Sequence, residues 1–418
     1  MNVKCPVIYK RKIRQYQFFR EIGVIMWFVN CNVFDSLTGE LLKNRHVEVN
    51  DNGRVAQISL DRPSTSSSIY DLGGRTLMSG IISAHTHLSV VFPFSDTDPN
   101  ESPAITAFRA AQRAGDALRA GITTIRCVHE QNQVDLLLKR AIKKGWIHSP
   151  RIYGAGRAIS TPHGHGAGSA CSYAQGGDGF YRAAIDELEA GADHVKIFIN
   201  GGLARAGESP EDAEMTDEEI AGTVKAAKEY NTYVVAHSGD SIAIMQALKQ
   251  GVRSFEHIYR LNESTAQALA SAGAFVTPTL CVTRSESWMR KNSFEEASIQ
   301  NALNASEQHL ISVKRAIAAN IPLINGTDYP PGDIVEEIPA ALYELFLMQD
   351  AGLTPLQALH SISINAAKLL NAQNEIGQIA PGFVADFIAV ANDPLQNLDT
   401  LRDISLVVQS GRVVREDL

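Results

Sequence analysis

The chain of 418 residues is long enough for one large domain and a smaller one, and its 44% hydrophobic and 20% charged residues are typical of a globular protein. Its formal net charge of −8 at pH 7 argues against nucleic acid or an anionic membrane surface as a partner, because both attract positive charge. The five cysteines form no CxxC pair, which argues against a disulfide framework and predicts a reducing compartment, the cytoplasm. No apolar run is long enough to predict a membrane span.

The N-terminal segment 1–25 is basic. Arg20 and Glu21 interrupt the only apolar stretch that could form the core of a secretory signal. We therefore expect a loose extension, with a targeting arm as the alternative, and a folded unit that begins near Met26.

Both ends of the folded unit have a strand-like pattern. Residues 26–77 and 373–418 contain short β-branched runs separated by turn signals, which predicts a small β-sandwich domain built from both chain ends. The middle, residues 78–372, alternates short apolar runs with helical stretches. Eight such runs over this length predict a (β/α)8 barrel. A doubly wound open sheet is the alternative, but no GxGxxG or GxxxxGK[ST] motif supports it.

Polar side chains mark the carboxyl ends of the predicted barrel strands, which is where barrel enzymes carry their chemistry. The run "IISAHTHL" ends the first strand with His85 and His87. Residues two apart on a strand share a face, so both imidazoles are expected to reach one ion. The later strands end with the remaining candidates, which are Lys196, His237, His257 and Asp328.

Each of these residues also has a plainer interpretation. A strand histidine is often a core residue, Lys196 could extend along the rim of the barrel, and Asp328 before Tyr-Pro-Pro could form a turn. The fold by itself does not require four histidines and an aspartate at the ends of four strands. Neutral imidazole and carboxylate are ligands that suit Zn²⁺ and similar ions, so the set predicts a metal site.

The order HxH, Lys, His, His, Asp resembles the amidohydrolase superfamily. Several local strings resemble its imidazolonepropionase-related branch, which includes Xaa-Pro dipeptidase-like enzymes: "MSGIISAHTHL", "ADHVKIFINGG", "VVAHS", "GVRSFEH", "NGTD" and "IGQIAPGFVADFIAV". The resemblance runs from about Trp27 to the end of the chain. It implies a metal-dependent hydrolase of amide bonds, without naming the substrate.

In two-metal members of the family, the counterparts of His85, His87 and Asp328 hold the more buried ion. The resemblance implies two divalent ions here, with Zn²⁺ as the expected metal. A hydroxide between the ions is then the nucleophile, because a bound metal lowers the pKa of water. Asp328 would accept the proton of this nucleophile and deliver it to the leaving amine.

The second ion would be held by His237 and His257. The resemblance further implies that Lys196 reacts with CO2 to form a carbamate that bridges the ions. The context "VKIFINGG" resembles that of a carboxylated lysine. A free ammonium cannot bind a cation, whereas a carbamate supplies anionic oxygens.

Three residues are candidates for substrate contact. His165 lies in the glycine-rich string "STPHGHGAG", where related enzymes place a substrate-contacting histidine, whereas His163 is expected to face solvent. Tyr259 follows His257 by two residues and would face the same mouth. Arg205, in "NGGLARAGESPED", would bind a substrate carboxylate, with an ordinary surface arginine as the alternative.

The predicted function is hydrolysis of an amide bond in a small molecule, with dipeptides or N-acyl amino acids as the expected substrates. One alternative is a one-metal cyclic-amide hydrolase or deaminase. The resemblance implies that a deaminase would carry a carboxylate just past the histidine of the fifth strand. Asp240 stands at that place, and we interpret it as the N-cap of the following helix. Another alternative is a non-catalytic binding relative. A homo-oligomer is expected from the family resemblance alone.

Overall fold

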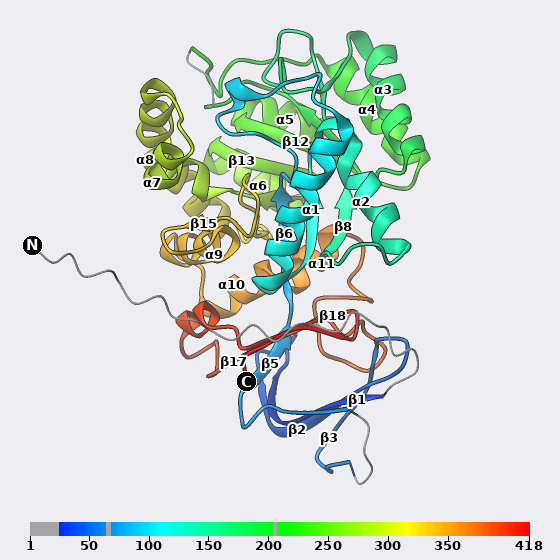
Figure 1. Ribbon diagram of the computed structural model, residues 1–418. Helices are drawn as coiled ribbons and strands as arrows, with labels where there is room; N and C mark the ends of the chain where they lie inside the picture. Colours follow the sequence, from blue (N-terminus) through cyan, green and yellow to red (C-terminus); the bar gives the residue numbers. More distant parts are fainter. Residues whose placement is uncertain (1–24, 64–67, 204–206) are drawn as a thin grey trace, which may run out of the picture.

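The computed structural model describes residues 25–63, 68–203 and 207–418. A barrel of strands and helices lies above a smaller sheet that contains the C-terminal strands (Figure 1). The predicted extension 1–25 lies almost entirely outside the described residues. None of the helices within the described ranges combines the length and apolar character that crossing a membrane requires.

Strands from both ends of the chain form the smaller sheet, as the sequence predicts. These strands are β1 (Met26–Phe34), β2 (Leu41–Val49), β3 (Val55–Ser59), β4 (Ser68–Asp71), β5 (Thr76–Ser79), β17 (Phe387–Val390), β18 (Leu406–Gln409) and β19 (Arg412–Glu416). Their order is β19-β18-β17-β5-β1-β2-β3, with β4 paired to β1. The two ends meet where β5 and β17 pair antiparallel, with Met78 opposite Ile388. The strands therefore form one continuous sheet rather than two separate ones.

Parallel strands form the barrel, which confirms the predicted fold class. They are β6 (Ile81–Thr86), β7 (Ile122–Cys127), β8 (Arg151–Gly154), β9 (Ile159–Ser160), β10 (Ser172–Tyr173), β11 (Val195–Phe198), β12 (Val234–Asp240), β13 (Ser254–Arg260) and β14 (Phe275–Thr277). They pair in the orders β6-β7-β8 and β10-β9-β11-β12-β13-β14. The extended segment 322–327, which is the eighth strand predicted from the sequence, pairs with β14 through a parallel bridge.

Backbone hydrogen bonds join these two groups of strands into a ring. The N–H of Asp193, just before β11, donates to the carbonyl oxygen of Gly154 in β8 at 2.7 Å. At the other junction, the N–H of Ala84 in β6 donates to the carbonyl oxygen of Asn325 at 2.7 Å. The barrel is therefore closed, and the carboxyl ends of its strands open at one mouth.

Helices cover the outside of the barrel (Figure 1). The α-helices are α1 (Pro103–Arg119), α2 (Val134–Lys143), α3 (Gly176–Ala190), α4 (Asp217–Glu229), α5 (Ser241–Gln250), α6 (Glu263–Ser271), α7 (Glu286–Lys291), α8 (Glu296–Ala318), α9 (Ala340–Asp350), α10 (Pro355–Ser361) and α11 (Ile364–Leu369). Short elements between them are η1 (Phe94–Asp96), η2 (Gln131–Gln133), η3 (Leu280–Thr283), β15 (Ile334–Val335), β16 (Ile338–Pro339) and η4 (Leu398–Arg402). Thr216 and Glu219 form a capping box at the start of α4, and Asp240 caps α5 as predicted.

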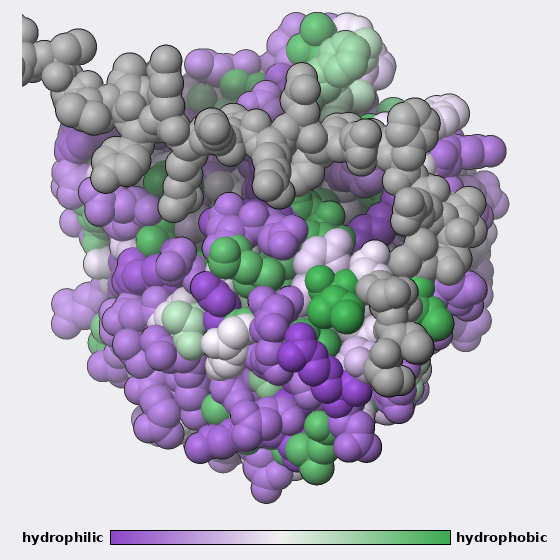
Figure 2. Space-filling model, turned by 60° about the horizontal axis from the view of Figure 1, so that its bottom comes forward, coloured by the Kyte–Doolittle hydropathy of each residue, from purple (hydrophilic) through white to green (hydrophobic). Residues whose placement is uncertain are grey.

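One apolar core extends from the barrel into the sheet. Phe34 and Ile388 of the sheet belong to the same buried cluster as Ile122 of the barrel. This cluster crosses the predicted domain boundaries at residues 77 and 372. The division of the chain into a barrel domain and a small β domain therefore stays a prediction. On the side of the sheet, the described surface is mainly hydrophilic, with apolar residues in small separate groups (Figure 2).

Candidate metal centre

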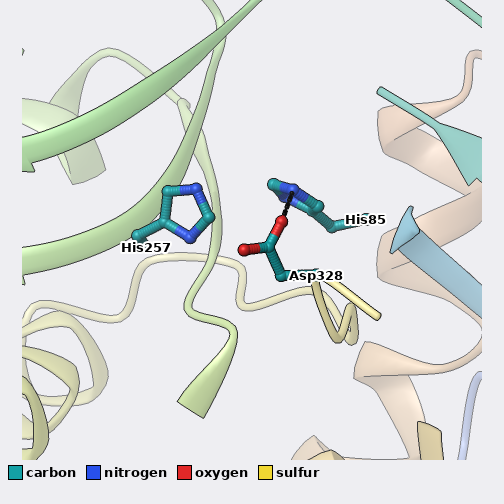
Figure 3. Close-up of side chains that lie close together, drawn as sticks. All are labelled: His85, His257 and Asp328. Atoms are coloured by element: carbon teal, nitrogen blue, oxygen red, sulfur yellow. Dashed lines mark ion pairs between the residues drawn. The ribbon is translucent and has the colours of Figure 1, made fainter. Parts of the chain in front are cut away.

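His85 and His87 stand at the carboxyl end of β6 and face Asp328. The Nε2 atom of His85 lies 2.8 Å from Oδ1 of Asp328 (Figure 3). Nε2 of His87 lies 3.0 Å from the same oxygen. The eighth strand can approach β6 this closely because residue 326 is glycine. A Cβ at Gly326 would lie 2.6 Å from Cβ of His85.

The hydrogen bonds of His87 fit a cation. Its Nδ1 lies 2.9 Å from the carbonyl oxygen of His129, which can only accept, so Nδ1 carries the proton. In a neutral imidazole, Nε2 then has a lone pair that faces the carboxylate oxygen of Asp328. Two electron-rich atoms at this distance repel each other unless a proton or a metal ion lies between them.

The hydrogen bonds of His85 also fit a bound cation. Its Nδ1 lies 2.6 Å from Oε2 of the buried Glu256, while its Nε2 faces Asp328. A neutral imidazole has one N–H and cannot donate to two carboxylates. A metal ion on Nε2 would replace the missing proton. A histidine that donates its other nitrogen to a carboxylate is the usual arrangement in metal sites.

Asp328 and His257 complete a group that could hold an ion. One ligand atom from each of His85, His257 and Asp328 lies within 4.8 Å of the others (Figure 3). Burial alone would raise the pKa of Asp328, but the imidazoles of His85 and His87 hold that pKa well below its usual value. The carboxylate is therefore ionised, which is the form that binds metal. Asp328 and His257 also have positive φ angles, 65° and 71°. Such strain in residues other than glycine is concentrated at functional sites.

His237 and Lys196 lie next to this group. The ring centroids of His237 and His257 are 4.5 Å apart, and Nε2 of His237 faces the carbonyl oxygen of Gly201 at 3.2 Å. Burial lowers the pKa of both histidines well below the ordinary value, so they are neutral and able to bind metal. Burial also lowers the pKa of Lys196 to about 8, which makes part of its amine neutral at physiological pH.

Two of the three predicted substrate residues line a cavity at this mouth. His165, His237, Tyr259 and Asp328 form the polar side of this cavity. The ring of His165 stacks on that of His237 at 4.3 Å, and its Nδ1 pairs with Glu208 at 2.9 Å. Tyr259 stacks on His257 at 5.4 Å. Arg205 lies outside the described residues.

Sequence reasoning missed two buried charged residues beneath the site. Nη2 of Arg126 in β7 lies 2.9 and 3.0 Å from the two carboxylate oxygens of Glu256 in β13, and both residues have no exposed surface. The signal was a charged residue inside each of two apolar runs, "TTIRCV" and "SFEHI". Strand alternation places Glu256 on the interior face. The positive φ of His257, the next residue, lets its side chain reach the same site.

Other histidines near the mouth have structural roles or face solvent. Nδ1 of His129 accepts from the N–H of Ala158 at 3.1 Å, and its Nε2 donates to the carbonyl oxygen of Ser169 at 2.7 Å. Burial lowers the pKa of His129 to about 3, so it stays neutral. Its own carbonyl oxygen orients His87. His163 is exposed, as expected.

A closed β/α barrel with these side chains at the strand ends is the scaffold of a barrel enzyme. The profile of the amidohydrolase family matches residues 76–414, and the chain belongs to that family. It is accordingly a hydrolase that acts on carbon–nitrogen bonds. Members of this family typically use metal ions, and His85, His257 and Asp328 could hold one.

Individual relatives cover most of the chain. The ochratoxinase of Aspergillus niger is 26% identical over 403 residues, which span 87% of this chain and 81% of the relative. The imidazolonepropionase of Shewanella loihica is 25% identical over 366 residues, which span 77% of this chain and 79% of the relative. Among solved structures, a prolidase complexed with N-methylphosphonate-L-proline superposes with a TM-score of 0.86 at 25% identity, covering 94% of this chain and 100% of the prolidase.

Proposed function

We propose that the protein is a metal-dependent hydrolase that cleaves the amide bond of a dipeptide or an N-acyl amino acid. The observation that carries this proposal is the convergence of His85 and His87 on one oxygen of Asp328, with hydrogen bonds that leave both Nε2 atoms suited to a cation. Relatives that include a prolidase and an ochratoxinase support an amide or peptide substrate.

The proposed ligands divide into two sets. His85, His87 and Asp328 would hold one divalent ion, and His237 and His257 would hold a second, with Zn²⁺ as the expected metal. Divalent ions held there would polarise the scissile carbonyl and make water nucleophilic near neutral pH. The neutral state of His237 and His257 supports their assignment as ligands.

Lys196 is proposed to become an anionic bridge between the two ligand sets. Its neutral amine would attack CO2, forming an N–C bond and releasing one proton, which gives a carbamate with two oxygen ligands. A pKa of about 8 supports this step, because a fully protonated ammonium has no lone pair for the attack.

Asp328 is proposed as the group that moves the proton. Its ionised carboxylate is part of the polar side of the cavity, where it would accept a proton from the attacking water and then donate that proton to the leaving amine. His165 and Tyr259 line the same cavity and would orient the substrate carbonyl. Arg205 stays a candidate for binding a substrate carboxylate.

The test is amino-acid release from a panel of dipeptides and N-acyl amino acids, using enzyme supplied with Zn²⁺ and bicarbonate. We expect turnover of a subset of the panel, loss of turnover with a chelator, and a rate at least about a hundredfold lower in Asp328→Asn. The variant should keep the thermal midpoint within a few degrees. Metal content and intact-mass analysis of Lys196 carboxylation are measured on the same samples.

Failure of this test would favour the alternative function, a one-metal cyclic-amide hydrolase or deaminase. If a metal-replete enzyme holds one ion per chain, carries no CO2 on Lys196 and cleaves no member of the panel, the proposal is wrong. Cyclic amides and amino-heterocycles would then be assayed, because an imidazolonepropionase matches 77% of the chain. Binding without turnover of either group would favour a non-catalytic relative.

A further inference from the structure

The cavity at the candidate metal centre has two chemically different sides. His165, His237, Tyr259 and Asp328 form the side toward the proposed ligands. Apart from Ser298 and Tyr329, the rest of the lining is apolar and forms a wall of Phe94, Leu203, Val282, Met289, Phe294 and Ala302. Ser298 is the polar residue of this wall, and none of the described residues that line it carries a charge.

Most of the apolar wall comes from the segment that follows β14. Val282 belongs to η3, Met289 to α7 and Ala302 to α8, while Phe94 comes from η1 after the first barrel strand. Loops and helices after the strands of such a barrel determine what it binds, whereas the strands hold the chemistry. This position fits a specificity wall rather than a part of the barrel core.

Aromatic contacts hold the wall in a fixed arrangement. The ring of Phe92 lies 5.1 Å from Phe94, 6.1 Å from Phe294 and 5.0 Å from Trp288, measured between centroids. Trp288 in turn stacks on Tyr329 at 3.9 Å, and Tyr329 directly follows Asp328. The wall is therefore connected by packing to the reacting end of the cavity. A pre-formed apolar surface binds without a large ordering cost.

The other edge of the wall is also anchored. The side-chain amide of Asn301 in α8 donates to the carbonyl oxygen of Leu203 at 3.1 Å. This bond joins Leu203, which follows β11, to the helix that carries Ala302. The apolar residues thus come from separate elements that are tied together, as expected for a binding wall.

We propose that this wall receives a bulky apolar substituent, an aromatic or branched aliphatic side chain, on one side of the scissile amide. The inference rests on the proposed function and names its substrate class. An apolar group would displace water from Phe294, Met289 and their neighbours, which is favourable. A charged substituent would lose its hydration without gaining a partner among the described wall residues, which is strongly unfavourable.

The experiment uses two dipeptide series, X-Gly and Gly-X, in which X is Phe, Leu, Ala, Glu or Lys. The wild-type enzyme is expected to show kcat/KM at least about tenfold higher for Phe and Leu than for Ala in one series, with Glu and Lys lowest. The other series should discriminate less, because its varied group lies away from the wall.

Two variants alter the wall in opposite directions. Phe294→Ala enlarges it, and kcat/KM for the Phe dipeptide of the discriminating series should fall roughly tenfold, mainly through KM, with less than about a twofold change for the Ala dipeptide. Ala302→Leu fills space in the same wall and should exclude Phe more than Ala. It also keeps the inference testable if the first variant does not fold.

Arg290→Ala provides the matched control. Arg290 lies on α7 next to Met289, but its side chain is half exposed and pairs with Glu286 and Glu296. It does not line the cavity, so its substitution should leave the preference for Phe over Ala unchanged.

The outcomes separate the inference from the proposed function. If the wild-type enzyme cleaves none of these dipeptides or the wider panel, the proposed function itself fails. If it cleaves them without preferring Phe and Leu in either series, or prefers Glu or Lys, the inference is overturned and the amide-hydrolase proposal stands. Equal losses for Phe and Ala dipeptides in Phe294→Ala would also overturn it.

Discussion

His85 owes its orientation to a buried ion pair. Glu256 accepts the Nδ1 proton of His85, and Arg126 neutralises the charge of Glu256. Burial by itself raises the pKa of Glu256, yet the guanidinium of Arg126 and the imidazole of His85 lower it far below its usual value. Glu256 therefore stays ionised inside the barrel. It acts on the proposed metal through His85, as a positioning residue.

We predict that Glu256→Gln weakens metal binding. The amide keeps the size of the side chain but holds the imidazole less strongly, so the affinity for Zn²⁺ should fall about 10- to 100-fold. Competition with a coloured chelator measures this affinity. The exposed Glu263→Gln serves as the control, and unchanged affinity in Glu256→Gln would contradict the role assigned to the carboxylate.

Asp135 is a second buried carboxylate, and it supports the loop after β8. Its Oδ2 accepts from the N–H of Gly156 at 2.9 Å, and its Oδ1 accepts from Leu136 at 2.9 Å. Burial, followed by the nearby charge of Glu130, raises the pKa of Asp135 to about 8. Since the unfolded value is about 3.9, the folded state binds a proton more tightly over this interval. The stability due to this proton is present below about pH 4 and is lost as the pH rises through about 8.

The corresponding prediction concerns the slope of stability with pH. In Asp135→Asn, the free energy of unfolding should fall less steeply between about pH 5 and pH 7, by up to roughly 1.4 kcal/mol per pH unit. Urea unfolding at a series of pH values measures this slope. The exposed Asp178→Asn is the control, and parallel profiles for wild type and Asp135→Asn would refute the assignment.

At the level of elements, side-chain caps fix the start of several helices that follow barrel strands, among them α4, α5 and α6. Asp240 ends β12 and accepts hydrogen bonds from the N–H groups of Ile242 and Ala243, which begin α5. These bonds satisfy donors that have no partner inside the helix. The cap holds the end of the strand that carries His237. The position of Asp240, three residues after His237, is thus explained by helix capping.

Substitution of Asp240 distinguishes capping from catalysis. Asp240→Ala should lower the free energy of unfolding by about 0.5–2 kcal/mol, whereas Asp240→Asn should keep most of the stability, because asparagine also caps helices. Both variants should retain amide hydrolysis within a few-fold of wild type. A large loss of kcat in Asp240→Asn at unchanged stability would support the deaminase-like alternative.

At the scale of the whole molecule, the small sheet closes the barrel at the end opposite the site. Gly121, in the turn between α1 and β7, lies against this sheet. A Cβ at that position would lie 2.7 Å from Cδ1 of Ile404 and 3.1 Å from Cγ2 of Ile388. Glycine therefore permits the close contact between the barrel and the sheet.

We predict that Gly121→Ala destabilises the protein more than Gly145→Ala. Both glycines have positive φ angles, 90° and 72°, but a Cβ at Gly145 meets nothing within 4 Å. The difference between the two variants thus reports crowding at the junction, and it should be roughly 1–3 kcal/mol. Denaturant unfolding measures both. Equal losses would show that the junction can relax.

The sequence by itself determined the barrel, the sheet from both chain ends and the positions of His85, His87 and Asp328 at the strand ends. It could do so because apolar periodicity and strand alternation are local properties of the chain. Helix caps such as Asp240 were predictable for the same reason. Local patterns thus identified the candidate site without any knowledge of distances.

Only the tertiary structure decided which atoms meet. The contacts of Glu256 with His85 and Arg126, and the apolar wall around Phe294, join residues far apart in the chain. The hydrogen bonds that a side chain of the site can form depend on where its strand turns, as at His257. The packing of the apolar wall depends on the loops and helices that follow the strands. No local pattern contains this information, because it arises when the barrel closes and brings the ends of its strands to one mouth.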